Sequence, residues 1–215
     1  MSVRSFARDL GIAGSLLATG CSTQHKPEAD PARLVSLMQT MDKHTPAPGG
    51  APTCTPEQMI GGATMTQVSL LKIAKEPANA GPERDDWINP AELDSPAARE
   101  LIDPAADETT KRQAAYELLS APFYLVYRVD LVDAPMALKI KELKRGTVSL
   151  RAVRFDKKGN VACVKVMIVL NNLEVSDNAI LKSNLVVMDP KVSEELRNDL
   201  RDQLLKHVAA LGRPD

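Results

Sequence analysis

GTVSLRAVRFDKKGNVACVKVMIVL, residues 146–170, is the stretch that decides the fold. Its first part alternates apolar and polar side chains, which is the period of two of a strand with one buried face. Between its two parts, Gly159 can take the left-handed conformation that a short hairpin loop with a bulge requires. The second part has apolar residues at every other position: Ala162, Val164, Val166, Ile168 and Leu170. The stretch therefore predicts an antiparallel hairpin over 147–170.

Another strand is expected before this hairpin, at residues 123–133, FYLVYRVDLVD, because they alternate in the same way. Upstream, residues 64–74, TMTQVSLLKIA, fit a helix about as well as a strand, so both interpretations stay open. Helices are expected over SPAARELI, residues 95–102, and over DETTKRQAAYELLSA, residues 107–121.

The last part of the chain predicts a long helix. Asp189 can cap it, Pro190 suits its first turn and Gly212 can end it. An apolar residue recurs at every fourth position: Val192, Leu196, Leu200, Leu204 and Val208. A single apolar stripe needs one partner, most naturally a face of a sheet. The predicted fold class is therefore α+β, a small antiparallel sheet with helices packed on one face.

Length and composition exclude several classes of protein. A chain of 215 residues has room for one ordinary domain plus appendages. Aromatic residues make up only 3%, which argues against stacking platforms for nucleic-acid bases and against aromatic shelves for carbohydrate. The net charge is −1, so no electrostatic argument favours a nucleic-acid partner.

The first twenty residues have the order of an export signal. Residues 1–9, MSVRSFARD, carry two arginines, and the apolar run LGIAGSLLA, residues 10–18, follows. That run is too short to span a bilayer as a helix, and two small residues separate it from Cys21. We expect residues 1–20 to be a signal peptide, although a buried N-terminal helix that ends in a cysteine is the alternative.

The sequence LATGC, residues 17–21, resembles the bacterial lipobox. The resemblance implies that a lipid is attached to the thiol of Cys21 and that the chain is cut before it. Ala18 departs from that pattern, in which leucine usually stands three positions before the cysteine. The residue after the cysteine is Ser22, and by the same resemblance a residue other than aspartate favours the outer membrane. The resemblance thus implies a cell-envelope protein that is lipid-anchored at the outer membrane and faces the periplasm.

Residues 21–56 are expected to be a flexible leash with one short amphipathic helix. The helix is PARLVSLMQTMDKH, residues 31–44, in which Leu34, Leu37, Met38 and Met41 share a face. Four prolines and two glycines then break regular structure over residues 44–56. The globular domain is expected over residues 57–215.

Cysteine counting leaves a pair. If Cys21 is acylated, Cys54 and Cys163 remain, and an even pair in an oxidising compartment favours a disulfide. Two separate buried thiols are the alternative.

No sequence motif for catalysis, a cofactor or a metal is present, so no cofactor is expected. An acidic loop offers oxygen ligands that suit Ca²⁺, although a solvated loop explains it more simply: Glu83, Asp85, Asp86, Glu92 and Asp94. A basic run suits anionic headgroups, although a solvated strand explains it more simply: Lys139, Lys141, Lys144 and Arg145. Two histidines lie in the leash, and the third is expected to be solvated near the end of the last helix: His25, His44 and His207.

The leading functional hypothesis is a membrane-anchored, non-enzymatic interaction or assembly module with a protein partner in the envelope. The alternative is a periplasmic carrier of an apolar ligand, for which a void of several hundred Å³ is the discriminating feature. An enzyme of an unrecognised type is the third hypothesis, and polar side chains converging in a cleft would favour it.

Overall fold

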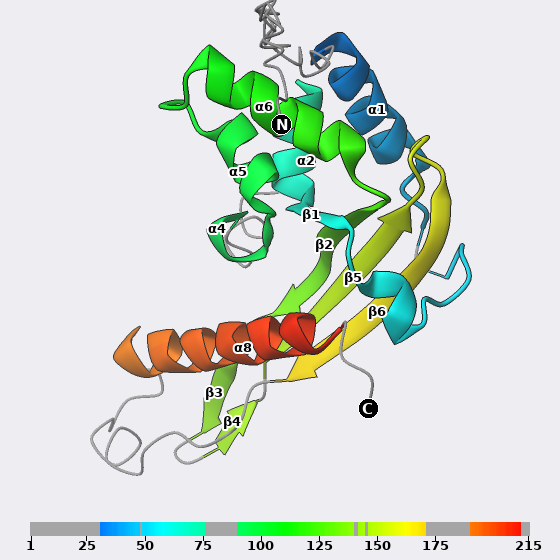
Figure 1. Ribbon diagram of the computed structural model, residues 1–215. Coiled ribbons are helices and arrows are strands. Elements are labelled where there is room, and N and C mark those ends of the chain that lie inside the picture. The colour runs from blue at the N-terminus through cyan, green and yellow to red at the C-terminus, as the bar shows by residue number, and fades with distance from the viewer. Residues whose placement is uncertain are drawn as a thin grey trace, which may run out of the picture.

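The computed structural model describes residues 31–47, 49–75, 90–139, 142–144, 146–170 and 190–211 (Figure 1). Its main sheet has the strand order β1-β2-β5-β6. The strands are β1 (Ala63–Thr66), β2 (Tyr124–Asp133), β5 (Thr147–Phe155) and β6 (Val161–Leu170). A separate two-stranded sheet consists of β3 (Met136–Lys139) and β4 (Glu142–Lys144). The helices are α1 (Pro31–His44), η1 (Pro56–Met59), α2 (Gln67–Ala74), α4 (Pro90–Leu93), α5 (Pro96–Ile102), α6 (Glu108–Ser120) and α8 (Pro190–Ala210).

The expected hairpin over 147–170 is confirmed. β5 and β6 pair antiparallel from Thr147 opposite Leu170 to Phe155 opposite Val161. In the turn, Gly159 has a φ of 82°, which an L-residue with a side chain adopts only at a cost. The Asp156 carboxylate accepts the backbone N–H groups of Lys158 and Asn160, so the turn satisfies its own donors.

The segment that fitted either a helix or a strand contains both. β1 ends at Thr66, whose hydroxyl accepts the backbone N–H of Ser69 and caps α2. β1 pairs with β2 in parallel. The sheet is therefore mixed, whereas the sequence predicted a wholly antiparallel one. A parallel pair needs a long crossover, and the helices between β1 and β2 carry the chain back across the sheet.

The α+β class is confirmed, but helices pack on both faces of the sheet, not on one. The helix layer, which we define as α1, α2, α5 and α6, covers one face at its end nearest β1 (Figure 1). There it buries Tyr124, Val126, Val153, Phe155 and Val164. α8 packs on the opposite face, in a second buried cluster that includes Val148, Leu150, Met167 and Val169. The one-face expectation failed because successive residues of β2 are apolar on both sides of the strand.

The expected helix over residues 31–44 is α1, and it belongs to the packed structure. Leu34, Met38 and Met41 are all buried in the helix layer, as one apolar face predicts. Cys54 is buried against the opposite face of the sheet. The packed structure therefore includes residues that precede position 57.

Candidate interaction surface

Four large apolar side chains lie exposed on one part of the sheet. Their exposed fractions are 54% for Leu131, 49% for Val166, 66% for Ile168 and 47% for Leu170. Large contiguous apolar patches are uncommon on the surface of soluble proteins and mark sites of interaction.

The strand register brings these four side chains to one face. Leu131 pairs with Ser149, and Ser149 pairs with Ile168, so the three form a row across the sheet. Val166 and Leu170 flank Ile168 on the same side of β6, because side chains two apart along a strand share a face. This is also the face that the helix layer covers farther along, since Val164 is buried there. We call Leu131, Val166, Ile168 and Leu170 the open face.

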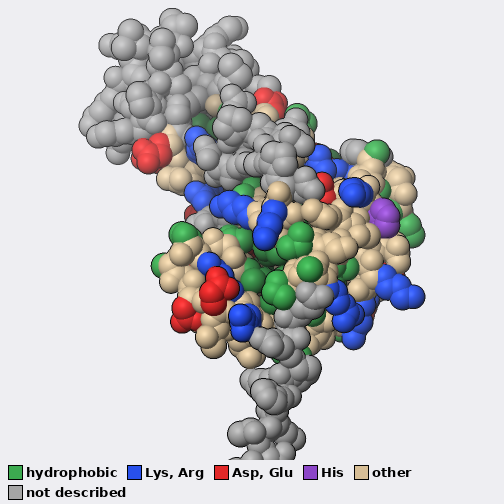
Figure 2. Space-filling model, turned by 90° about the horizontal axis from the view of Figure 1, so that it is seen from above, with side chains coloured by type: hydrophobic (Ala, Val, Ile, Leu, Met, Phe, Trp, Pro, Cys, Tyr) green, Lys and Arg blue, Asp and Glu red, His purple; other side chains and the backbone are tan. Residues whose placement is uncertain are grey.

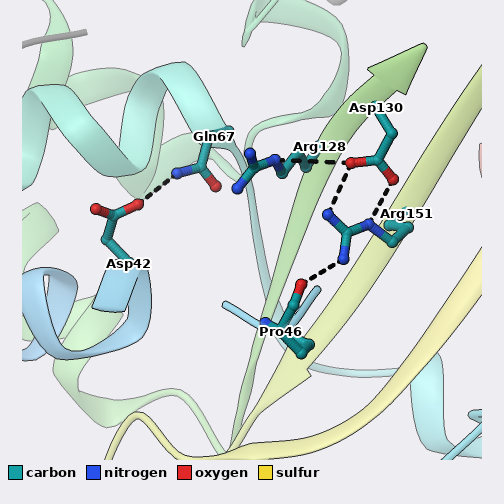
Figure 3. A network of polar contacts seen from close by, with 6 residues as sticks. All are labelled: Asp42, Pro46, Gln67, Arg128, Asp130 and Arg151. Atoms are coloured by element: carbon teal, nitrogen blue, oxygen red, sulfur yellow. Dashed lines mark hydrogen bonds and ion pairs between the residues drawn. The ribbon is translucent and has the colours of Figure 1, made fainter. Parts of the chain in front are cut away.

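A largely buried ion pair, between Arg151 and Asp130, lies between the open face and the helix layer (Figure 3). Arg151 on β5 donates from Nε and Nη2 to the two carboxylate oxygens of Asp130 on β2, with Nη2 and Oδ1 2.7 Å apart. Its Nη1 donates to the carbonyl oxygen of Pro46, so it also binds the loop after α1 to the sheet. Arg128 lies 3.7 Å from the same carboxylate and is more exposed. In Figure 3 the guanidinium of Arg151 lies between Asp130 and Pro46.

β6 is an edge strand of the main sheet, and among the described residues only the start of its outer side is paired. The backbone N–H of Val164 donates to Pro52, and its carbonyl accepts from the N–H of Cys54. Backbone groups two residues apart along a strand point the same way, so those of Val166 and Ile168 also point outward. In the described part of the chain, no backbone group pairs with them there. An unpaired edge of this kind is a template for another strand.

The disulfide expected between Cys54 and Cys163 is present. Both residues are buried, and their Cα atoms are 5.0 Å apart. The bond fastens the segment before η1 to the start of β6, beside the bridge between Thr53 and Val164. It therefore holds this short paired segment against the start of β6.

The helix layer also contains a groove of about 530 Å³ between α1, α2, α5 and α6, which we call the helix-layer groove. Its lining combines apolar side chains with four cationic ones. Figure 2 views the molecule from the side of this layer and shows hydrophobic side chains gathered with Lys and Arg around them. The apolar lining includes Leu34, Val35, Ile73, Leu101 and Ala115, and the cationic lining is Lys72, Lys75, Lys111 and Arg112.

The other candidate residues are dispersed. Cys21, His25, Glu83, Asp85, Asp86, Lys141 and Arg145 lie outside the described residues. Glu92 is exposed and lies 3.9 Å from Arg201, whereas Asp94 is buried. Nδ1 of His207 contacts the carbonyl of Gln203 on the exposed side of α8, as expected of a solvated helix-end histidine. Nδ1 of His44 lies 3.0 Å from the carbonyl of Gly159.

Asp94 is part of a buried polar cluster. Its carboxylate accepts the Ser69 hydroxyl and, at 2.6 Å, the backbone N–H of Thr66. Burial raises the pKa of Asp94 above the ordinary aspartate value, although these hydrogen bonds oppose the change. Because Ser69 and Thr66 are buried too, the cluster acts as a structural cap for the start of α2.

Asp94 predicts a pH dependence of stability. We expect the free energy of unfolding, taken relative to an Asp94→Asn variant, to fall as pH rises from about the ordinary aspartate pKa to the raised one. In that window the unfolded chain releases the proton while the folded one keeps it. Urea unfolding between pH 4 and 7 measures this.

Asp107 supplies a control of opposite sign. It is exposed, and the N–H of Thr110, 2.7 Å from its carboxylate, lowers its pKa. The stability of the wild type relative to Asp107→Asn should therefore fall as pH falls. If the free energy of unfolding of the wild type, taken relative to Asp94→Asn, rose with pH, the raised pKa of Asp94 would be contradicted.

No family model, no curated protein and no solved structure matches this chain. Over the described ranges, no three His, Cys, Asp or Glu side chains gather as a metal site requires. None of the helices in that part of the chain is both long and apolar enough to cross a membrane.

Proposed function

We propose that this chain is a lipid-anchored protein of the cell envelope and works as a non-enzymatic interaction module. In this proposal the lipid on Cys21 holds it at the outer membrane, facing the periplasm, and the open face binds a protein partner. The observation that carries the proposal is the open face itself, four exposed apolar side chains beside an edge of β6 that no described backbone group pairs beyond Val164. Such a surface suits a partner that is also a polypeptide.

The disulfide supports the proposed location in the periplasm. Disulfides persist in oxidising compartments such as the periplasm and are rare in the cytosol. With Cys54 and Cys163 bonded, Cys21 is the cysteine left for acylation in a chain of three. Its place after a charged segment and a short apolar run is that of an anchor.

We infer that the partner contributes an extended strand to β6. The outward N–H and C=O groups of Val166 and Ile168 would pair with its backbone, and alternate side chains of that strand would contact the open face. Ser149 lies between Leu131 and Ile168, and its small side chain would leave room for the side chains of that strand.

In-cell photo-crosslinking tests the partner. A photo-reactive phenylalanine replaces Ile168 or, as a matched control, Ile60, which is 52% exposed but lies at the end of η1. We expect a defined envelope protein to crosslink at 168 and not at 60, and Ile168→Glu but not Ile60→Glu to abolish the complex. Equal products at both positions, no product, or only a dimer of this chain would overturn the proposed partner.

Intact mass tests the anchor separately. Protein purified from membranes without reductant should lack residues 1–20, carry a diacylglyceryl group, and contain oxidised Cys54 and Cys163. Cys21→Ala should leave it unlipidated. A full-length, unlipidated wild-type mass with free thiols would overturn the envelope assignment.

A carrier of an apolar ligand remains the second candidate, because the helix-layer groove has the several hundred Å³ expected of a ligand site. Its exposed lining, which includes Pro31, Ser36 and Lys72, makes it a surface groove and not an enclosed cavity. A carrier should purify with a bound apolar molecule that mass spectrometry of an organic extract detects.

A further inference from the structure

We propose that the helix-layer groove binds an anionic phospholipid of the membrane surface, with an acyl segment on its apolar lining and the phosphate among its lysines. The identity of the membrane rests on the proposed function. The binding itself rests on the groove alone.

The apolar lining comes from four different helices. α1 supplies Leu34 and Val35, α2 supplies Ile73, and α6 supplies Ala115, while Leu101 comes from α5. Because these helices line different sides of the groove, an acyl segment bound there would contact apolar side chains on several sides and be shielded from water on them. The volume falls within the range of small-molecule sites.

The charge of the lining is strongly one-sided. Against four cationic side chains stands one carboxylate, that of Glu108. Lys72 lies on the last turn of α2 and Lys75 is the C-cap of that helix, while Lys111 lines the same groove from α6. Among the described residues no carboxylate pairs with Lys72, Lys75 or Lys111. A lysine can rest its methylene chain on the apolar lining and keep its ammonium in water, where a phosphate would meet it.

The position of the groove suits a protein that is tethered at its N-terminus. Pro31 begins α1 and lines the groove, and Cys21 is ten residues before it. Ten residues span at most about 35 Å. A lipid on Cys21 would therefore keep the groove within reach of the bilayer. The C-terminal end of β6 lies at the other end of the sheet from the helix layer (Figure 1), so the open face would stay accessible.

Vesicle flotation tests the groove without the anchor. The full chain carrying Cys21→Ser is mixed with vesicles of phosphatidylcholine, with or without phosphatidylglycerol. We compare Lys72→Gln/Lys111→Gln with Lys157→Gln/Lys158→Gln, an equal loss of charge in the exposed hairpin turn. Neutralising two lysines at an anionic surface should lower the partition coefficient by about 30-fold. The control pair should change it little.

A groove-filling variant separates a bound lipid from mere adsorption. Ser36 is exposed and lines the groove, so Ser36→Trp should obstruct it, keep the fold and remove most of the binding. If Lys72→Gln/Lys111→Gln unfolds the protein, Lys72→Gln/Lys75→Gln replaces it, because both of those lysines are exposed.

The proposal is overturned if Ser36→Trp binds like the parent, which would indicate surface adsorption only. It is also overturned if Lys157→Gln/Lys158→Gln lowers the partition coefficient as much as Lys72→Gln/Lys111→Gln does. The same holds if vesicles with phosphatidylglycerol bind the protein no better than vesicles without it. Because Cys21 is absent throughout, these outcomes do not depend on whether the natural protein is acylated.

Discussion

Replacing Cys54 and Cys163 together with alanine should lower the free energy of unfolding by about 4–5 kcal/mol. The bond joins residues 109 apart in sequence, and closing so long a loop removes much of the conformational entropy of the unfolded chain. Alanine suits both positions because each side chain is buried, so a hydroxyl would add an unsatisfied polar group. Urea unfolding followed by circular dichroism measures the change.

Reductant provides the internal control for this prediction. Dithiothreitol should destabilise the wild type by a similar amount and leave the double alanine variant unchanged. A loss below about 1 kcal/mol would mean that the unfolded chain gains little freedom when the bond is absent, contrary to the loop-closure argument.

Arg151→Met should lower the free energy of unfolding by about 3–5 kcal/mol, because it leaves the Asp130 carboxylate without its main partner in a largely buried position. Arg128→Met is the matched control, since Arg128 contacts the same carboxylate. The side chain of Arg151 is 3% exposed and that of Arg128 is 39% exposed. The Arg128 variant should therefore lose no more than about 1 kcal/mol.

A second substitution tests the cause. Adding Asp130→Asn to Arg151→Met removes the stranded charge, so the double variant should recover part of the lost stability. If it is less stable than Arg151→Met alone, the cost comes from lost packing or from the contact with Pro46. Equal losses for Arg151→Met and Arg128→Met would contradict the role of burial.

The regular elements follow from local patterns in the sequence. The hairpin over 147–170 has alternation and a turn glycine, and α8 keeps its apolar residues at every fourth position, with Leu196, Leu200, Leu204 and Val208 buried. Cysteine counting also found the correct pair. Such features depend on residues near one another in the chain or on the chemistry of one residue type.

The open face shows where the sequence misleads. Val166, Ile168 and Leu170 continue the apolar line of Ala162 and Val164, and that line was interpreted as one face without a break. In the structure the helix layer ends at Val164, and the apolar residues beyond it are exposed. Where a covering layer stops is a tertiary property, and periodicity along one strand carries no information about it.

The Arg151–Asp130 pair was missed for a related reason. Charged residues in a strand ordinarily indicate its solvent side, and nothing local distinguishes Arg151 from Arg128. Arg151 is buried and Arg128 is exposed because of the register between β2 and β5 and because Pro46, more than 100 positions earlier, contacts Arg151.

The disulfide has a mechanical consequence. In the proposed arrangement, any tension between the membrane at the N-terminus and a partner on β6 would act across the protein. That load would run along the chain to Cys54 and cross the covalent bond to Cys163. The chain between them could otherwise extend by roughly 350 Å or more. Because the bond bypasses it, β1, β2, β5 and most of the helix layer would stay folded under a pull that would otherwise unravel them.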